Sequence, residues 1–456
     1  MSIIINTRSP YYIKVKPTSG TLVSASMSLY IYSGTFTTDK PASAQYTITK
    51  NIIGTNNYVI YEVTELIRDF IVTEYESYAT DTVWVEADIT LTKSSGSETQ
   101  NLDYLGIDGY GYFEDGVNPR TSTNPINTIV SSTTTGASAY KLIDSGQLFL
   151  QTASIGDTIE NTTDSTSTTI TGIDSNTQLS LKNDIMSSSE NYNLKGTPNF
   201  TPQYLQSNTK IYFKQGRDII FPVFAEPEGT ISFTTGGGVN VFWNQVEDFW
   251  NLYDVAWGNT LSDITISDST DSKQKIIYIR VTPTTTLQTG DVITVASTKT
   301  SPTNFVQSVT LTLEEICEPK FDYLEVIFYN KYGALQIMPF HKKSVTSVNT
   351  NSDSFKRNLM DFVNDPTYSN EKHQIRQFHV TGKESITMNT GYIDESFNEI
   401  MKQLLFSEQV WVYDGSTVNP ITLNTKSLQY KKSVNDRLIN YTIDFEYAFN
   451  KINDIR

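Results

Sequence analysis

A stretch near the C-terminus, residues 438–449, alternates strictly between apolar and polar side chains. A period of two over this length predicts a long β-strand with one buried face and one polar face. The residues expected on the buried face are Ile439, Tyr441, Ile443, Phe445, Tyr447 and Phe449. We therefore expect a sheet of long strands at this end of the chain.

An amphipathic helix is predicted just before this strand. Its apolar positions follow the i, i+3, i+4, i+7, i+8 spacing of one helix face: Phe397, Ile400, Met401, Leu404 and Leu405. Asp394 or Ser396 can cap the helix, and Glu399 completes a capping box if Ser396 is the cap. The Asp414-Gly415 pair that follows is a hairpin signal. We therefore expect this helix to lie on the sheet, with Leu404 and Ile400 buried against the Tyr441 and Phe445 face.

The rest of the chain predicts a mainly β fold in several domains. Short runs rich in Tyr, Ile, Val and Thr alternate with Gly, Pro and Asn, as in antiparallel strands and their turns. Residues 1–144 predict an N-terminal β-sandwich completed by residues 196–225, with a helical turn at residues 64–71 capped by Thr64. Residues 226–316 predict a second, Ig-like β-sandwich. Residues 317–456 predict a C-terminal α+β domain, so the expected fold class is a multi-domain chain of antiparallel sandwiches.

Residues 145–195 differ in composition from the sequence around them. They hold almost no aromatic residues and many Thr and Ser, and their apolar residues stand singly. We expect a small all-β module inserted into the first sandwich. The loop expected at residues 103–135 carries three carboxylates within residues 107–116, but they lack the alternate spacing of a calcium loop.

The charge and the cysteine content limit the kinds of partner, and the cellular compartment, that we expect for this protein. The formal net charge is −16, from 34 basic and 50 acidic residues, which argues against binding to nucleic acid or to anionic membranes. Cys317 is the only cysteine, so no intrachain disulfide can form, which fits folding in a reducing cytoplasm. We read no signal peptide in residues 1–20 and expect a soluble protein.

The sequence contains no motif that predicts catalysis. His341, His373 and His379 are the only histidines and lack zinc-ligand spacing, and we expect His373 and His379 to lie in solvent. No Gly-x-Ser-x-Gly elbow occurs, and Cys317 lacks the signatures of a thiol nucleophile. Pairs of carboxylates arise by chance among fifty acidic residues, so none is assigned to glycoside hydrolysis. We therefore expect no catalytic residue, no metal site and no cofactor.

Aromatic residues recur at helical spacing in the second sandwich. Trp243, Val246, Trp250, Tyr253 and Trp257 would form one apolar seam on a helix, whereas on loops they could form a platform for stacking sugars. We favour packing between domains or subunits. The candidate interface residues are therefore Trp243, Trp250, Tyr253 and Trp257, and glycan binding stays open as the alternative.

Three C-terminal segments, residues 330–335, 380–392 and 438–449, together resemble structural proteins of tailed bacteriophages that infect Bacteroidetes, including crAss-like phages. Residues 145–194 are similar to small β modules inserted into many phage virion proteins, in their segments 156–164 and 179–185. The resemblance points to a virion setting without fixing one position in the particle.

This resemblance implies a non-enzymatic building block of the tail, the tail hub or the collar ring. The protein would assemble in the host cytoplasm as a homo-oligomeric ring with other tail or neck proteins, without direct contact to nucleic acid or membrane. Such a role depends on the area of the interfaces between subunits rather than on catalysis. Two alternatives remain: a receptor- or glycan-binding virion protein, and a tail-associated glycan-degrading enzyme, which would need a cleft with two convergent carboxylates.

Overall fold

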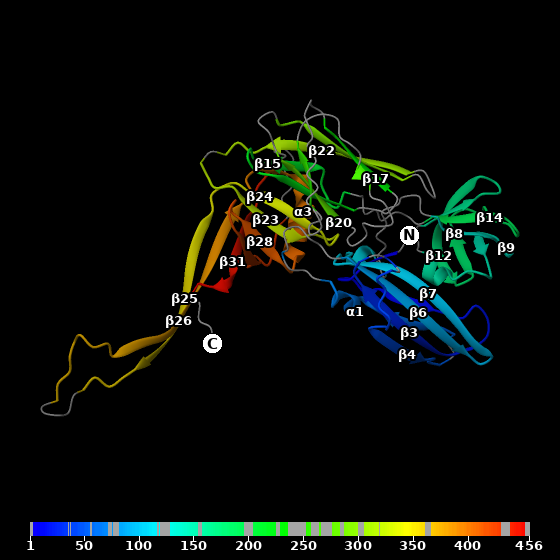
Figure 1. Ribbon diagram of the computed structural model, residues 1–456, viewed down its shortest axis with the longest axis horizontal. Helices are drawn as coiled ribbons and strands as arrows, with labels where there is room; N and C mark the ends of the chain where they lie inside the picture. The colour runs from blue at the N-terminus through cyan, green and yellow to red at the C-terminus, as the bar shows by residue number, and fades with distance from the viewer. Residues whose placement is uncertain are drawn as a thin grey trace. The chain divides into compact units, whose positions relative to one another are not determined.

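The protein is mainly β, with several antiparallel sheets and a small helical segment near the C-terminus (Figure 1), so the predicted fold class is confirmed. The computed structural model describes residues 3–34, 36, 38–54, 57–71, 75, 82–115, 118, 128–153, 157–195, 204–224, 229–235, 252–256, 264–265, 276–282, 287–299, 305–318, 320–360, 366–429 and 438–451. The chain divides into two compact units. Unit 1 comprises Met1–Ile211, Asp218–Glu314 and Asn330–Leu335, and unit 2 comprises Tyr212–Arg217, Glu315–Tyr329 and Gln336–Arg456.

The N-terminal part of unit 1 contains a five-stranded sheet. Its strand order is β1 (Ile3–Asn6), β7 (Gly96–Ile107), β6 (Val83–Lys93), β3 (Leu22–Tyr32) and β4 (Tyr46–Asn51). All neighbours are antiparallel except β1 and β7, which run parallel. A two-stranded sheet of β2 (Tyr12–Val15) and β5 (Val59–Glu62) contributes to the same apolar core, which includes Val15, Met27, Leu29, Tyr61 and Ile89.

The helical turn predicted near residue 64 is α1 (Thr64–Arg68), but Thr64 does not cap it. Thr64 is the first helical residue, Val63 occupies the N-cap position, and no side chain bonds the cap. The Thr64 backbone N–H and hydroxyl instead donate to the carboxylate of Glu62. The capping prediction was wrong by one residue because the carboxylate two positions earlier already satisfies these donors.

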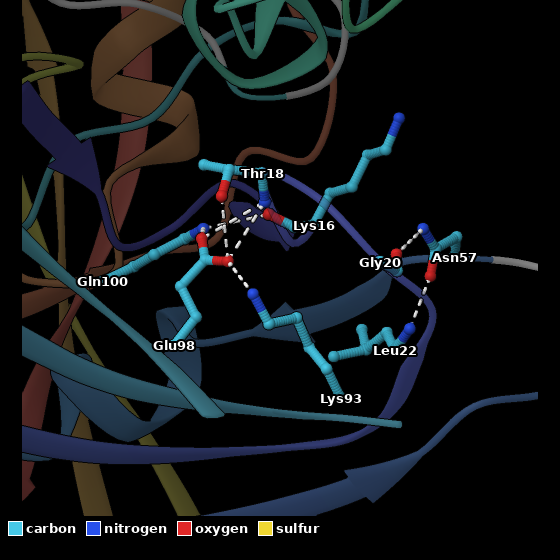
Figure 2. A network of polar contacts seen from close by, with 8 residues as sticks. All are labelled: Lys16, Thr18, Gly20, Leu22, Asn57, Lys93, Glu98 and Gln100. Atoms are coloured by element: carbon cyan, nitrogen blue, oxygen red, sulfur yellow. Dashed lines mark hydrogen bonds and ion pairs between the residues drawn. The ribbon is translucent and has the colours of Figure 1, made fainter. Parts of the chain in front are cut away.

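A polar network lies beside the turn that joins β6 to β7 (Figure 2). The carboxylate of Glu98 accepts hydrogen bonds from the Thr18 backbone N–H at 3.2 Å, the Thr18 hydroxyl at 3.0 Å, Lys93 Nζ at 3.0 Å and Gln100 Nε2 at 3.1 Å. Gln100 Nε2 also donates to the carbonyl of Lys16 at 2.9 Å. These bonds fasten the loop between β2 and β3 over the hairpin.

The small β module forms a seven-stranded antiparallel sheet. Its order is β8 (Thr128–Thr133), β14 (Asn191–Lys195), β11 (Thr158–Asn161), β12 (Thr166–Ser175), β13 (Gln178–Leu181), β10 (Lys141–Ile143) and β9 (Gly136–Ser138). Its core includes Phe149, from the short helix α2 (Phe149–Thr152), and Tyr192. The expected boundary at residue 145 falls inside this sheet, because β8 and β10 pair with β14 and β13. Strands β7 and β8 also extend into the loop expected at residues 103–135, over residues 103–107 and 128–133, where weak apolar patterning gave no strand signal.

Two further sheets follow. One has the order β15 (Lys210–Phe213), β22 (Phe305–Glu315), β21 (Val292–Lys299), β17 (Gly229–Thr235) and β19 (Ile264–Thr265). The other has the order β16 (Ile219–Phe224), β20 (Ile276–Thr282) and β18 (Leu252–Ala256). Residues 196–225 were expected to complete the first sandwich, but β15 and β16 pair with strands of the second. A local pattern predicts a strand and does not specify its partner, which is why this assignment failed.

Unit 2 contains a seven-stranded sheet with α3 (Asn398–Phe406) packed against it. The order is β24 (Leu335–Phe340), β23 (Leu324–Tyr329), β28 (Val410–Tyr413), β29 (Val418–Leu423), β31 (Thr442–Asn450), β26 (Ile375–Asn389) and β25 (Val345–Lys356). Two further short strands, β27 (Ile393–Asp394) and β30 (Leu438–Ile439), pair antiparallel with each other. One core joins the predicted helix stripe to the predicted strand face, and it contains Phe397, Ile400, Met401, Leu404, Tyr441, Ile443 and Phe445.

The details of the C-terminal prediction need two corrections. The single strand expected at residues 438–449 is two strands, β30 and β31, and its apolar face is buried only as far as Phe445, since Phe449 is exposed. The Asp394 side chain accepts from the Ser396 backbone N–H at 2.9 Å and caps the 3-10 turn η2 (Glu395–Phe397), while α3 itself has no side-chain cap. The turn inserted before α3 moved the capping residue away from the helix.

Candidate interaction arm

The last two strands of the C-terminal sheet continue beyond it as a two-stranded ribbon. Strand β31 pairs with β26 only between Asn389 and Lys383, whereas β25 accompanies β26 down to Ile375. Figure 1 shows β25 and β26 running side by side past β31. We call residues 351–356 of β25 together with residues 375–382 of β26 the β arm.

The β arm exposes apolar side chains on both of its faces. Phe355 and Phe378 share one face and are 46% and 50% exposed, with ring centroids 5.7 Å apart in an edge-on arrangement. Arg376 lies opposite Phe355 in the ladder, and Asp353 lies opposite Phe378. Ile375, on the other face, is 63% exposed. A ribbon of two strands has no second layer to cover these residues, and such a ribbon alone is marginally stable in water.

The base of the arm is firmly anchored. Ile386 and Met388 of β26 are buried in the core of unit 2. Ion pairs flank the point where the ribbon leaves the sheet: Lys383 Nζ lies 2.6 Å from Glu446, and Lys451 Nζ lies 2.6 Å from Glu384. The anchored base holds the exposed ribbon in a defined direction relative to its sheet.

A buried histidine lies under the end of β26. Gly391 has φ 75°, and a Cβ there would lie 2.1 Å from Nε2 of His341, so the imidazole fills the space that only glycine leaves. Burial, with a smaller contribution from Lys342, lowers the pKa of His341 to about 4. His341 is therefore neutral at pH 7. His373 and His379, in contrast, are exposed as predicted.

A β-bulge lies within the arm. The ladder shifts between Asn351 and Asp353, where β26 contributes an extra residue, and His379 there has φ 54°. A bulge of this kind bends and twists the strand that carries it. The bulge therefore changes the direction of the distal half of the ribbon, which carries Phe355 and Phe378.

The aromatic seam predicted in the second sandwich contributes nothing to the arm. Trp243, Trp250 and Trp257 lie outside the described residues, and Tyr253 lies in β18, whose side chains are likewise outside them. A helix through Tyr253 is wrong, because Leu252–Ala256 is a strand that pairs in parallel with β20. The helical spacing therefore does not hold at Tyr253, and the interface role of the four residues stays a prediction.

Sequence reasoning missed strand β25, which continues into the β arm, although a signal was present. Residues 345–352 of β25 read Val-Thr-Ser-Val-Asn-Thr-Asn-Ser, which suits an extended chain but offers no face that alternates toward a core. A strand of this kind is exposed on both faces. Sequence patterns indicate strands through a buried face, so this segment gives no strand prediction.

In the part of the chain that the structure describes, no group of three or more His, Cys, Asp or Glu side chains is placed to hold a metal ion. None of the helices there combines the length and the apolar character needed to cross a membrane.

Comparison with known proteins adds no assignment. No protein-family model and no curated protein matches the chain. Among solved structures, the chain is similar to the Bacteroides ovatus mixed-linkage glucan utilization locus protein SGBP-B in complex with a mixed-linkage heptasaccharide. The identity is 12%, the match covers 72% of this chain and 77% of that one, and the TM-score is 0.12. A TM-score this low carries no argument about fold or ligand.

Proposed function

We propose that the protein is a non-enzymatic structural subunit of a tailed bacteriophage virion and forms part of the tail, the tail hub or the collar ring. The observation that carries the proposal is the β arm, which exposes Phe355, Phe378 and Ile375 on a ribbon without a core of its own. Exposed apolar surface on an anchored ribbon is normally covered by a partner.

The position of the arm in the sequence supports the same proposal. Two of the three segments that resemble phage structural proteins adjoin it: residues 380–392 include much of β26, and residues 438–449 include β30 and most of β31. These two segments therefore lie mainly at the base of the arm, and the rest of the likeness lies in residues 330–335 and 145–194.

The charge of the arm suits contact with acidic subunits. Its charged residues are Lys356 and Arg376 against Asp353, two positive and one negative, which gives a net charge of +1. The chain as a whole has a net charge of −16. A weakly positive arm can approach a second acidic subunit without the repulsion that the rest of the chain would meet.

The direct test is to locate the subunit in intact virions by electron cryomicroscopy and to count its copies around the tail axis. We expect several copies in the tail or neck, with the arm covered by a neighbouring chain. Copies on the capsid shell, or no copies at all, would overturn the proposal. Binding of the purified protein to host surface polysaccharide, with no place in the tail, would favour the glycan-binding alternative instead.

Paired substitutions test whether the arm is the assembly element. The double variant Phe355→Ser with Phe378→Ser should fold normally and fail to enter particles, because it removes only exposed apolar surface. The matched control is Val23→Ser with Ile53→Ser, two apolar residues that are 51% and 82% exposed outside the arm. Equal incorporation of the two double variants would show that the arm is dispensable.

A further inference from the structure

Strand β25 has an outer edge with no strand beside it in the described part of the chain. It is the last strand of its sheet and pairs only with β26. Residues 345–352 contain no charge and no proline, and Val345 and Val348 are half exposed. An extended, uncharged edge with unpaired backbone groups is a template for another strand.

Two other edge strands of this chain, β2 and β5, have backbone groups covered by side chains. The Asn118 side chain accepts from the Tyr12 backbone N–H at 2.6 Å and donates to the Tyr12 carbonyl at 2.8 Å, which covers the edge of β2. Lys50 Nζ donates to the Ile60 carbonyl of β5 at 2.8 Å. Natural proteins use such polar and charged groups to prevent pairing at edges. Among the described residues, no such side-chain bond covers the outer edge of β25, which leaves this edge open to pairing.

The charges at the two ends of this edge are of opposite sign. Lys343, which is exposed, precedes the uncharged run, and Asp353 follows it. If two copies of β25 pair antiparallel about Val348, Lys343 of each copy lies opposite Asp353 of the other, because both are five residues from the centre. Parallel pairing would instead place like charges side by side. Opposite charges directly across a ladder stabilise it, and like charges destabilise it.

We infer that the β25 edges of two copies of this chain pair antiparallel about a two-fold axis at Val348, so that their C-terminal sheets join into one. The inference rests on the proposed function, since it names a partner for β25, the strand that continues into the arm, and gives the register of the pairing. The contact joins copies in pairs, so a ring requires a second, different interface elsewhere on the chain. Edge pairing buries less surface than a standard interface, so the pair is weak in solution and gains strength from repeated copies in a particle.

A cysteine at position 348, on the proposed two-fold axis, makes the pairing measurable. A disulfide between two copies links even a weakly associated pair covalently. We would combine Val348→Cys with Cys317→Ser, which removes the native thiol, and measure disulfide-linked dimer under mild oxidation. Cα atoms of facing residues in an antiparallel ladder are within disulfide reach. The matched control is Val23→Cys in the same background, since Val23 and Val348 are 51% and 55% exposed. We expect at least tenfold more linked dimer from Val348→Cys.

Charge reversal tests the register. Adding Lys343→Asp places two acidic residues opposite each other at both ends and should lower the dimer yield about tenfold. Adding Asp353→Lys to that variant restores opposite charges and should restore the yield. Should a disulfide at position 348 be geometrically unfavourable, mixing Val345→Cys with Asn351→Cys protein gives a second readout, since this register sets these residues opposite each other. Yields no higher than the control at both positions, or a yield unaffected by the charges, would overturn the pairing.

The outcomes separate this inference from the proposed function. If the cysteine variants do not link but the Phe355 and Phe378 double variant still fails to enter particles, the arm assembles with a different partner and only the pairing is wrong. If density beside β25 in virions belongs to another protein, the second-copy assignment is also wrong. If the cysteines link but virions lack the subunit, the pairing stands and the proposed function falls.

Discussion

The hairpins β6–β7 and β25–β26 are built from strands of similar length, 11 and 12 residues in the first and 12 and 15 in the second. The first is flanked by β3 and β1 and buries one face from end to end of β6, with the Glu98 network beside its turn. The second is flanked by β31 only at its base, and β25 is exposed along nearly all its length. The local sequence alone therefore does not determine whether a hairpin is packed within its own chain. We attribute the difference to a partner that completes the second hairpin.

The largest expected effect comes from the same substitution made in each hairpin. Ile89 on β6 is 1% exposed and Ile375 on β26 is 63% exposed. Ile89→Ala should lower the free energy of unfolding by about 2–5 kcal/mol, because it leaves a cavity in the N-terminal core. Ile375→Ala should change it by no more than about 0.5 kcal/mol. Urea denaturation of the isolated protein measures both, and comparable costs would show that the arm is packed within its own chain.

A smaller effect on stability is expected from a change of pH. It should affect unit 2, whose sheet anchors the arm. The pKa of His341 is about 4 in the folded protein against 6.5 for the ordinary side chain. Between these values the unfolded chain binds a proton that the folded chain does not, so the free energy of unfolding falls as the pH drops from about 6.5 to 4. We expect a loss of about 1–3 kcal/mol over this range.

The His341→Gln variant supplies the control for this pH effect. Because glutamine does not titrate, the stability of unit 2 should become flatter with pH in this range. Tryptophan fluorescence at Trp411 of β28 reports on unit 2, and that at Trp84 of β6 on unit 1. Single-tryptophan variants would separate the two signals. An unchanged slope in unit 2 would show that another group is responsible.

The smallest expected effect concerns the network over the β6–β7 hairpin. Burial would raise the pKa of Glu98, but hydrogen bonds from Lys93, Gln100 and Thr18 hold it below its ordinary range. Its contribution to stability is therefore present above the ordinary pKa of a glutamate and is lost as the pH falls through the lower folded value. Glu98→Gln should cost about 1 kcal/mol at pH 7, and the exposed Glu114→Gln should cost less than about 0.5 kcal/mol. Thermal unfolding at pH 7 measures the stability that each variant loses. Equal losses would show that the network over the hairpin does not stabilise the fold.

The sequence predicted the parts of the fold in which one face is buried. The spacing of Ile400, Met401 and Leu404 and the alternation through Ile443 and Phe445 both reflect contact with one apolar core, so pattern and structure agree there. Strand partners were not predictable: nothing in residues 210–224 indicates that β15 and β16 belong to the second sandwich. The arm was missed for the opposite reason, since a strand such as β25 that serves another chain carries no pattern for its own core.

Hydrogen–deuterium exchange of the isolated subunit and of assembled particles tests the central claim most directly, because it reads both hairpins in one measurement. In the isolated subunit, we expect slow exchange in β6 and β7 and fast exchange in residues 351–356 and 375–382, where the ribbon has two strands only. In particles, the arm should become as protected as β6 and β7, while those strands stay unchanged. An arm already protected in the isolated subunit, or still exchanging fast in particles, would contradict the account.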